Sequence, residues 1–161
     1  MNGLSLMALR LVLAVVFIAH GAHRLFGLFA GPAIGVGGPE ATAQIFATMG
    51  LEPNFPLAVL AGGLALVGGV LLAIGRFTRI VAPILALMTL IAVWKTQWQW
   101  GFFLNWVAAP DRGQGMEFSV VVIGALVCLA LTGAGDWSID GRRAHSAAAR
   151  SAGRARLRGK I

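Results

Sequence analysis

The stretch "LSLMALRLVLAVVFIAHGAHRLFG" (residues 4–27) decides the fold class, because its first sixteen residues carry a single charge, on Arg10. An α-helix needs roughly 20 apolar residues to cross the hydrocarbon core of a bilayer. The composition agrees, since 58% of the 161 residues are hydrophobic and only 12% are charged, whereas a soluble domain carries about 25% charged residues. We therefore expect an integral membrane protein.

Four stretches of the chain are apolar enough to be predicted spans: residues 4–26, 56–74, 77–94 and 118–132. Lipid offers no hydrogen-bonding partner to the backbone, so each span is expected to be helical. The short connection "GRFTR" makes the second and third spans neighbours, and Thr78 is the predicted N-cap of the third. The predicted fold is all-α, an antiparallel four-transmembrane-helix bundle formed by one domain, residues 1–140.

The second span has small residues spaced three or four apart, which places them on one helix face. Such a face lets a neighbouring helix approach closely, and packing is the interpretation that we prefer. The residues concerned are Ala58, Gly62, Ala65, Gly69 and Ala73.

The connections and the tail add further predicted features. "PEATAQIFATMG" (39–50) has a proline in its first turn, Glu40 at the positive end and a glycine stop, so a short interfacial helix is expected. The Trp-rich outer loop that begins at Trp94 resembles an aromatic belt at the membrane interface. Residues 141–161 carry seven basic residues and no acid, which predicts a disordered tail that is attracted to anionic lipids.

Basic residues predict the orientation. With four spans, both termini share a side with the turn at 75–79, and that side holds nine basic residues, against three (Arg24, Lys95 and Arg112) on the other. The positive-inside rule therefore places both termini in the cytoplasm. The net charge of +7 is explained by this topology, so no nucleic-acid partner is expected. The first span lacks a small-x-small cleavage site and is expected to stay in the mature protein.

Polar residues gather where the first span ends. His20, His23 and Arg24 are three and four positions apart and share one side of the helix. Polar side chains at this depth should face the bundle interior or a water-filled cavity. Glu117 begins the fourth span at a matching level, and an Arg24–Glu117 salt bridge is expected. The predicted set around this outer pocket is His20, His23, Arg24, Trp94, Lys95, Asn105 and Glu117.

Such a pocket could hold a quinone headgroup, with a histidine bonded to a carbonyl oxygen and Glu117 handling protons. The same residues equally fit a satisfied structural network that only fixes helix packing, and both interpretations stay open. A metal site at the two histidines and Glu117 has no support beyond helical spacing, so no metal is expected. No cofactor follows with certainty from the sequence, and quinone is the candidate.

A second polar group lies at the inner end. Arg10 is about 6 Å inside the first span, where it can snorkel to the interface or pair with an acid that follows the fourth span. The predicted structural latch consists of Arg10, Asp136, Trp137 and Asp140. The single cysteine, Cys128, excludes thiol–disulfide chemistry within one chain and is expected to be a packing residue.

Four segments occur in the order seen in the DoxX family and resemble its motifs: "GAHRLFG" (21–27), "MGLEPNFPLAVLAGGLALVGGVLLAIGRFTR" (49–79), "GQGMEFSVVVIGALVCL" (113–129) and "GAGDWSID" (133–140). The resemblance implies a four-span protein of the bacterial inner membrane. It also implies an association with quinone-linked redox or oxidative-stress complexes, since the wider group is similar to membrane subunits of thiosulfate:quinone oxidoreductase. Arg24 stands where the family commonly has lysine, and Ala65 stands about where many members carry glutamate.

The function expected from this resemblance is that of a membrane subunit with redox protein partners, whether or not it is itself an enzyme. The alternative is a non-catalytic scaffold or assembly protein that docks partners through its basic tail. A small-molecule transporter is a third class, but the spans show no internal repeat of the kind that transporters use. Association with a second copy of the chain is left open.

Overall fold

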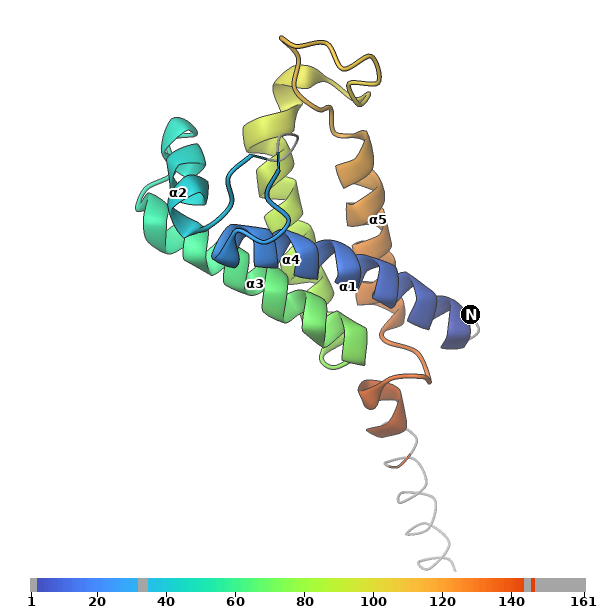
Figure 1. Ribbon diagram of the computed structural model, residues 1–161. Helices are drawn as coiled ribbons and strands as arrows, with labels where there is room; N and C mark the ends of the chain where they lie inside the picture. Colours follow the sequence, from blue (N-terminus) through green and yellow to red (C-terminus); the bar gives the residue numbers. More distant parts are fainter. Residues whose placement is uncertain (1–2, 32–34, 144–145, 147–161) are drawn as a thin grey trace, which may run out of the picture.

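The computed structural model describes residues 3–31, 35–143 and 146, so the predicted tail lies almost entirely outside the described residues. Among these residues the regular elements are helices, and no strand is formed, which confirms the all-α prediction. The main helices, shown in Figure 1, are α1 (Gly3–Phe26), α2 (Pro39–Thr48), α3 (Asn54–Ile74), α4 (Thr78–Ala92) and α5 (Glu117–Thr132).

Three helical segments of the described chain are long and apolar enough to cross a membrane: Gly3–Phe26, Asn54–Ile74 and Thr78–Trp100. The third is longer than predicted, because α4 continues through a π-helical turn, η1 (Val93–Gln97), and a 3₁₀ turn, η2 (Trp98–Trp100). Helix α5 is apolar but has 16 residues, which extend roughly 24 Å at 1.5 Å per residue. A fourth span therefore stays a prediction, as does an interfacial position for α2.

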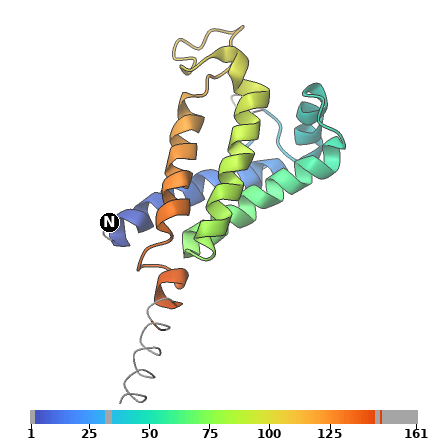
Figure 2. The same cartoon turned by 180° about the vertical axis from the view of Figure 1, so that it is seen from behind.

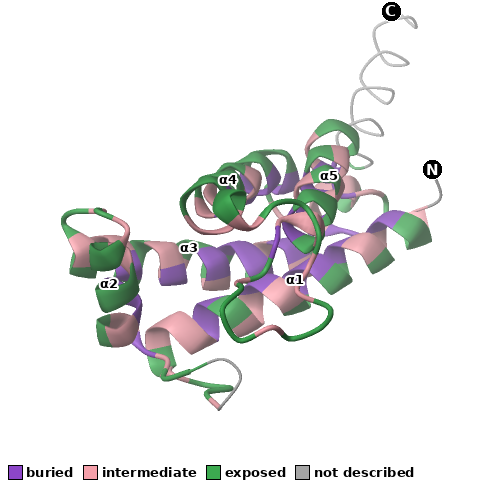
Figure 3. Ribbon diagram, turned by 90° about the horizontal axis from the view of Figure 1, so that it is seen from above, coloured by how far each residue is buried: buried purple, intermediate pink, exposed green. Residues whose placement is uncertain are grey.

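The four long helices form two antiparallel pairs, α1 with α3 and α4 with α5. The two pairs cross each other instead of aligning into one bundle, as Figures 1 and 2 show from opposite sides. Large side chains fill the space between the pairs and hold the two layers apart; the fully buried ones include Leu72, Leu85, Leu126 and Leu129. Figure 3 shows buried residues on the facing sides of the helices and exposed ones outside.

The α1–α3 contact is much closer, because it is built on glycine. A Cβ atom added at Gly21 would strike the backbone nitrogen of Leu66, and one at Gly69 would lie 2.9 Å from the backbone nitrogen of Ile18. Gly62 lies against Leu25 in the same way. The small face predicted for the second span is therefore the face that packs on α1.

A buried arginine ties together the helix ends that the predicted topology assigns to the cytoplasmic side; these ends are called inner below, and the opposite ends outer. Arg10 is 1% exposed, and its Nη1 donates to the carbonyl oxygens of Leu72 at 3.0 Å and Ala73 at 3.3 Å. Its Nη2 donates to the carbonyl oxygen of Trp137 at 2.7 Å. Gly75 has a φ of 66° and leaves room for the guanidinium, since a Cβ there would strike Nη1. Arg10 thus joins α1, the end of α3 and the segment after α5.

Asp140 extends this connection to α4. The backbone N–H of Thr78 donates to Asp140 Oδ2 at 3.1 Å, and the N–H of Asp140 donates to the carbonyl oxygen of Gly75 at 3.1 Å. Phe77, with a φ of 55°, occupies the N-cap position, so the prediction of Thr78 as N-cap was wrong. An acid 62 residues along the chain caps the helix instead, a role that local sequence does not show.

The other two residues of the predicted latch lie at the surface. The side chain of Trp137 is 66% exposed, and its contribution to Arg10 is its backbone carbonyl. Asp136 is exposed beside it. The described contacts of Arg10 are therefore made by backbone oxygens.

Replacing Arg10 by methionine is expected to destabilise the protein by about 3 kcal/mol, because three buried carbonyl groups lose charged hydrogen-bond donors. Arg10→Lys should recover only part of this, since one ammonium cannot reproduce the planar guanidinium fork. The midpoint of heat-induced loss of monodisperse protein in detergent measures the effect. Equal midpoints for wild type and Arg10→Met would contradict the assigned role.

The α1–α3 contact predicts a second stability difference. Gly21→Ala should lower stability by about 1–3 kcal/mol, because the added methyl group strikes backbone that cannot move aside. Gly63→Ala is the matched control on α3: a Cβ there has no neighbour within 4 Å among the described atoms, so stability should be unchanged or slightly higher. The same thermal assay compares the two, and an equal loss would refute close packing at Gly21.

Candidate functional site

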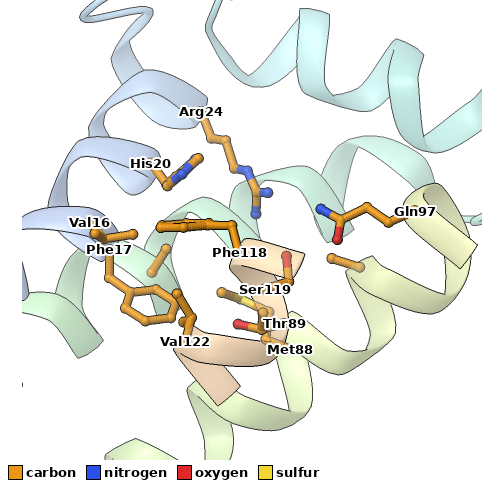
Figure 4. A pocket seen from close by; sticks show the side chains of 12 residues that line it. Val16, Phe17, His20, Arg24, Met88, Thr89, Gln97, Phe118, Ser119 and Val122 are labelled. Atoms are coloured by element: carbon orange, nitrogen blue, oxygen red, sulfur yellow. The ribbon is translucent and has the colours of Figure 1, made fainter. Parts of the chain in front are cut away.

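A cavity of about 180 Å³ lies between the two crossed helix pairs, in the half of the molecule that leads to the Trp-rich loop. All four long helices and η1 contribute to its lining (Figure 4). Its polar side chains are His20, Arg24, Thr89, Gln97 and Ser119, and its walls include Val16, Phe17, Met88, Phe118 and Val122.

The volume limits what the cavity can hold. One water molecule takes up about 30 Å³ in the liquid, and sites for drug-sized ligands start at about 300 Å³. The cavity therefore fits several waters or one small ring. Because His20 is both exposed and part of the lining, the cavity opens to the surface of the described chain.

Arg24 carries the only charge in the lining that is fixed at all ordinary pH values. Figure 4 shows its guanidinium pointing into the cavity toward Gln97. Within the described residues Arg24 has neither a hydrogen bond nor an ion pair, and none of the lining residues is acidic. The cavity is accordingly positive on this side.

Two further lining residues keep hydrogen-bonding capacity. Ser119 is buried and makes no hydrogen bond among the described residues, and Gln97 Oε1 is buried without a hydrogen-bond partner. The hydroxyl of Thr89 donates to the carbonyl oxygen of Leu85 at 2.8 Å and can still accept a bond. A buried polar atom without a partner is costly, so Gln97 Oε1 favours a ligand or water that can donate a hydrogen bond to it.

The π-helical turn η1 positions Gln97. Single π-turns inside α-helices insert an extra residue and often occur at functional sites. Here the turn follows directly on α4 and brings Gln97 into the lining, while Trp94 and Lys95 of the same turn are exposed.

Two of the seven residues predicted for the outer pocket, His20 and Arg24, line the cavity. His23 turns away, and its Nδ1–H donates to the carbonyl oxygen of Leu28 at 3.0 Å. Asn105 organises the outer loop, with its side-chain nitrogen donating to the carbonyl oxygens of Ala109 and Arg112.

The Arg24–Glu117 salt bridge that we expected is not formed between these two described residues. Glu117 begins α5, where a carboxylate is favoured by the helix dipole. Its Oε2 accepts a hydrogen bond from the backbone N–H of Leu104 at 3.2 Å. The carboxylate thus holds the outer loop to α5, which is why it does not neutralise Arg24.

Sequence reasoning missed three polar residues of the lining: Thr89, Gln97 and Ser119. A signal was available for two of them. Ser119 is a polar residue near the start of an apolar span, and Thr89 is a polar residue within the third span. Gln97 gave no such signal, since only the π-turn brings it toward the cavity.

The chemistry of the lining suits ligand oxygens. Arg24 and Ser119 can donate hydrogen bonds, and the imidazole of His20 can donate from one ring nitrogen and accept at the other. Among the described residues, no three His, Cys, Asp or Glu side chains gather where a metal ion could bind.

Comparisons with known proteins agree with the architecture. The DoxX family model matches residues 5–98, which include α2, α3, α4 and all of α1 except its first two residues. The chain is 30% identical over 132 residues to a protein of Bacillus subtilis named "Putative oxidoreductase CatD", covering 82% of this chain and 81% of the relative. No solved structure was found to match. The long apolar helices occur in the expected order, and both sequence matches agree with them. The chain therefore belongs to the DoxX family.

Proposed function

We propose that this DoxX protein is a membrane subunit of a quinone-linked redox complex, and that its cavity binds the quinone headgroup. The observation that carries the proposal is a cavity with apolar walls and hydrogen-bond donors, reached by all four long helices. The name of the Bacillus relative, a putative oxidoreductase, supports a redox association.

Different lining residues bind different parts of the ring in this proposal. Phe17 and Phe118 offer aromatic surfaces against which a flat ring can pack. His20, Arg24 and Ser119 supply donors for its oxygens. A ring fills a cavity of about 180 Å³, so any attached lipid tail must pass through the opening beside His20 into the surrounding lipid.

Electrons for such a reaction come from a protein partner in this proposal. Cys128 is the single cysteine of the chain, so one copy alone has no thiol pair that could pass electrons to a quinone. The contribution of the chain is to hold the ring, orient its oxygens and exchange a proton at His20. The subunit therefore provides a binding site for the quinone next to the protein partner that supplies the electrons.

The proposed orientation has both termini in the cytoplasm of a bacterial inner membrane. Its support is the distribution of basic residues, nine on one side and three on the other. The cavity then lies in the outer half of the protein, beneath the loop that Glu117 holds to α5.

Full-length protein extracted in gentle detergent is expected to retain close to one quinone per chain, measured chromatographically after solvent extraction. His20→Ala should lower retention about tenfold, because the ring loses a hydrogen bond. His23→Ala is the matched control, since His23 bonds to Leu28 outside the cavity, and retention should not change.

Two results would contradict the quinone site: no quinone in wild type, or the same loss in both histidine variants. The scaffold alternative would then be favoured. It predicts that deleting residues 141–161 abolishes the cellular phenotype, whereas substitutions in the cavity have no effect.

The orientation is tested by cysteine labelling in a Cys128→Ser background. Asp111→Cys lies in the exposed outer loop, and Arg143→Cys lies just after the segment that follows α5. A membrane-impermeant maleimide should label Asp111→Cys in intact cells and Arg143→Cys only after permeabilisation. The reverse pattern would invert the proposed topology.

A further inference from the structure

Arg24 places a permanent positive charge in the cavity without a visible counter-ion. Its guanidinium points into the cavity, and none of the lining residues is acidic. Burying a charge is expensive unless it is paired. An occupant of the cavity that carries a negative charge would therefore bind better than a neutral one of the same shape.

Among the described residues no neighbouring element supplies that negative charge, and α4 presents only the uncharged Met88, Thr89 and Ala92. On α1 the facing titratable group is His20, which is neutral or positive. Helix α3 presents Ala65, a fully buried methyl group, and η1 presents Gln97, an uncharged amide. On α5 the facing group is Ser119, while Glu117 is bonded to the outer loop.

The two arginines of α1 show why the missing partner of Arg24 is informative. Arg10, at the inner end, donates from both terminal nitrogens to three backbone carbonyl oxygens, and only its Nε is without a hydrogen-bond partner among the described residues. Arg24, at the outer end, has no hydrogen bond or ion pair within the described residues. Hydrogen bonds within the fold therefore account for the position of the Arg10 side chain. The guanidinium of Arg24 makes no such bond among the described residues and is available to a ligand.

We infer that the cavity selects the anionic form of a hydroxylated aromatic ring, a phenolate or a hydroquinone monoanion, over the neutral ring. The inference rests on the proposed ring site and adds the charge of its preferred ligand. On binding, the hydroxyl group loses its proton to solvent, and the ring oxygen that remains accepts hydrogen bonds from Arg24 and Ser119. The apolar walls hold the ring itself.

The buried amide of Gln97 fits a ligand with a second polar position. Its Oε1 has no hydrogen-bond partner and can accept a bond from a second hydroxyl group on the ring. A hydroquinone monoanion offers both features, one anionic oxygen for Arg24 and one hydroxyl for Gln97. A neutral quinone offers neither a charge for Arg24 nor a donor for Gln97.

4-Nitrophenol is a suitable probe, because it has one ring and its phenolate absorbs visible light whereas the neutral phenol does not. Purified full-length protein in detergent is titrated with the probe by equilibrium dialysis at several pH values. The bound probe should titrate about one pH unit below the free probe, which corresponds to a roughly tenfold preference for the anion.

Arg24→Gln keeps hydrogen-bonding capacity but removes the charge. It should still bind the neutral phenol, with the roughly tenfold anion preference lost, and Arg24→Lys should restore part of the preference. Because Arg24 has no partner among the described residues, Arg24→Gln is expected to fold, which size-exclusion chromatography checks. Lys95→Gln removes an exposed cation outside the lining and should leave the preference unchanged, which also controls for partition into micelles.

Each outcome separates the two proposals. A bound probe with an unshifted pKa would overturn the anion preference and leave the ring site intact. A preference that Lys95→Gln lowers as much as Arg24→Gln would assign it to general surface charge and overturn the role of Arg24. No saturable binding by wild type would refute the ring site, and the inference with it.

Discussion

The structure depends most on the hydrogen bonds of Arg10. A guanidinium that is 1% exposed is tolerated because its two terminal nitrogens donate to backbone carbonyl oxygens. Two of those oxygens belong to the last turn of α3, where helix carbonyls lack the usual i+4 donor, and the carbonyl of Leu72 also accepts from the N–H of Gly75 at 3.1 Å. The third, from Trp137, belongs to the segment after α5. One side chain thereby holds together parts of the chain that are more than a hundred residues apart.

This connection is strengthened by Asp140, which lies in the same segment and caps the first turn of α4. The inner ends of α1, α3 and α4 therefore meet the segment after α5 in one network of charged groups and backbone. Gly75 is required at its centre, because its left-handed backbone ends α3 and leaves space for the guanidinium. The inner half of the molecule is accordingly well packed, with the side chains of Arg10 and Leu72 almost completely buried.

The outer half is built differently, and this difference creates the cavity. Helices α1 and α3 stay close through Gly21 and Gly62, but they cross α4 and α5, so the pairs cannot remain in contact along their whole length (Figures 1 and 2). Polar groups at this end, such as Glu117 and Asn105, hold the outer loop. Arg24 is left facing the cavity, and its side chain has no hydrogen bond or ion pair among the described residues.

The sequence by itself determined the helical membrane architecture, because runs of about 20 apolar residues leave the backbone no other solution in lipid. It also identified the small face of α3, since helical periodicity alone assigns residues to a face, and it singled out Arg10, His20 and Arg24 as polar groups in an apolar helix. Only the tertiary structure decided which groups these residues meet. The cap from Asp140, the π-turn that brings in Gln97 and the contact of Glu117 with the outer loop all join distant segments or depend on local backbone geometry, which residue spacing does not encode.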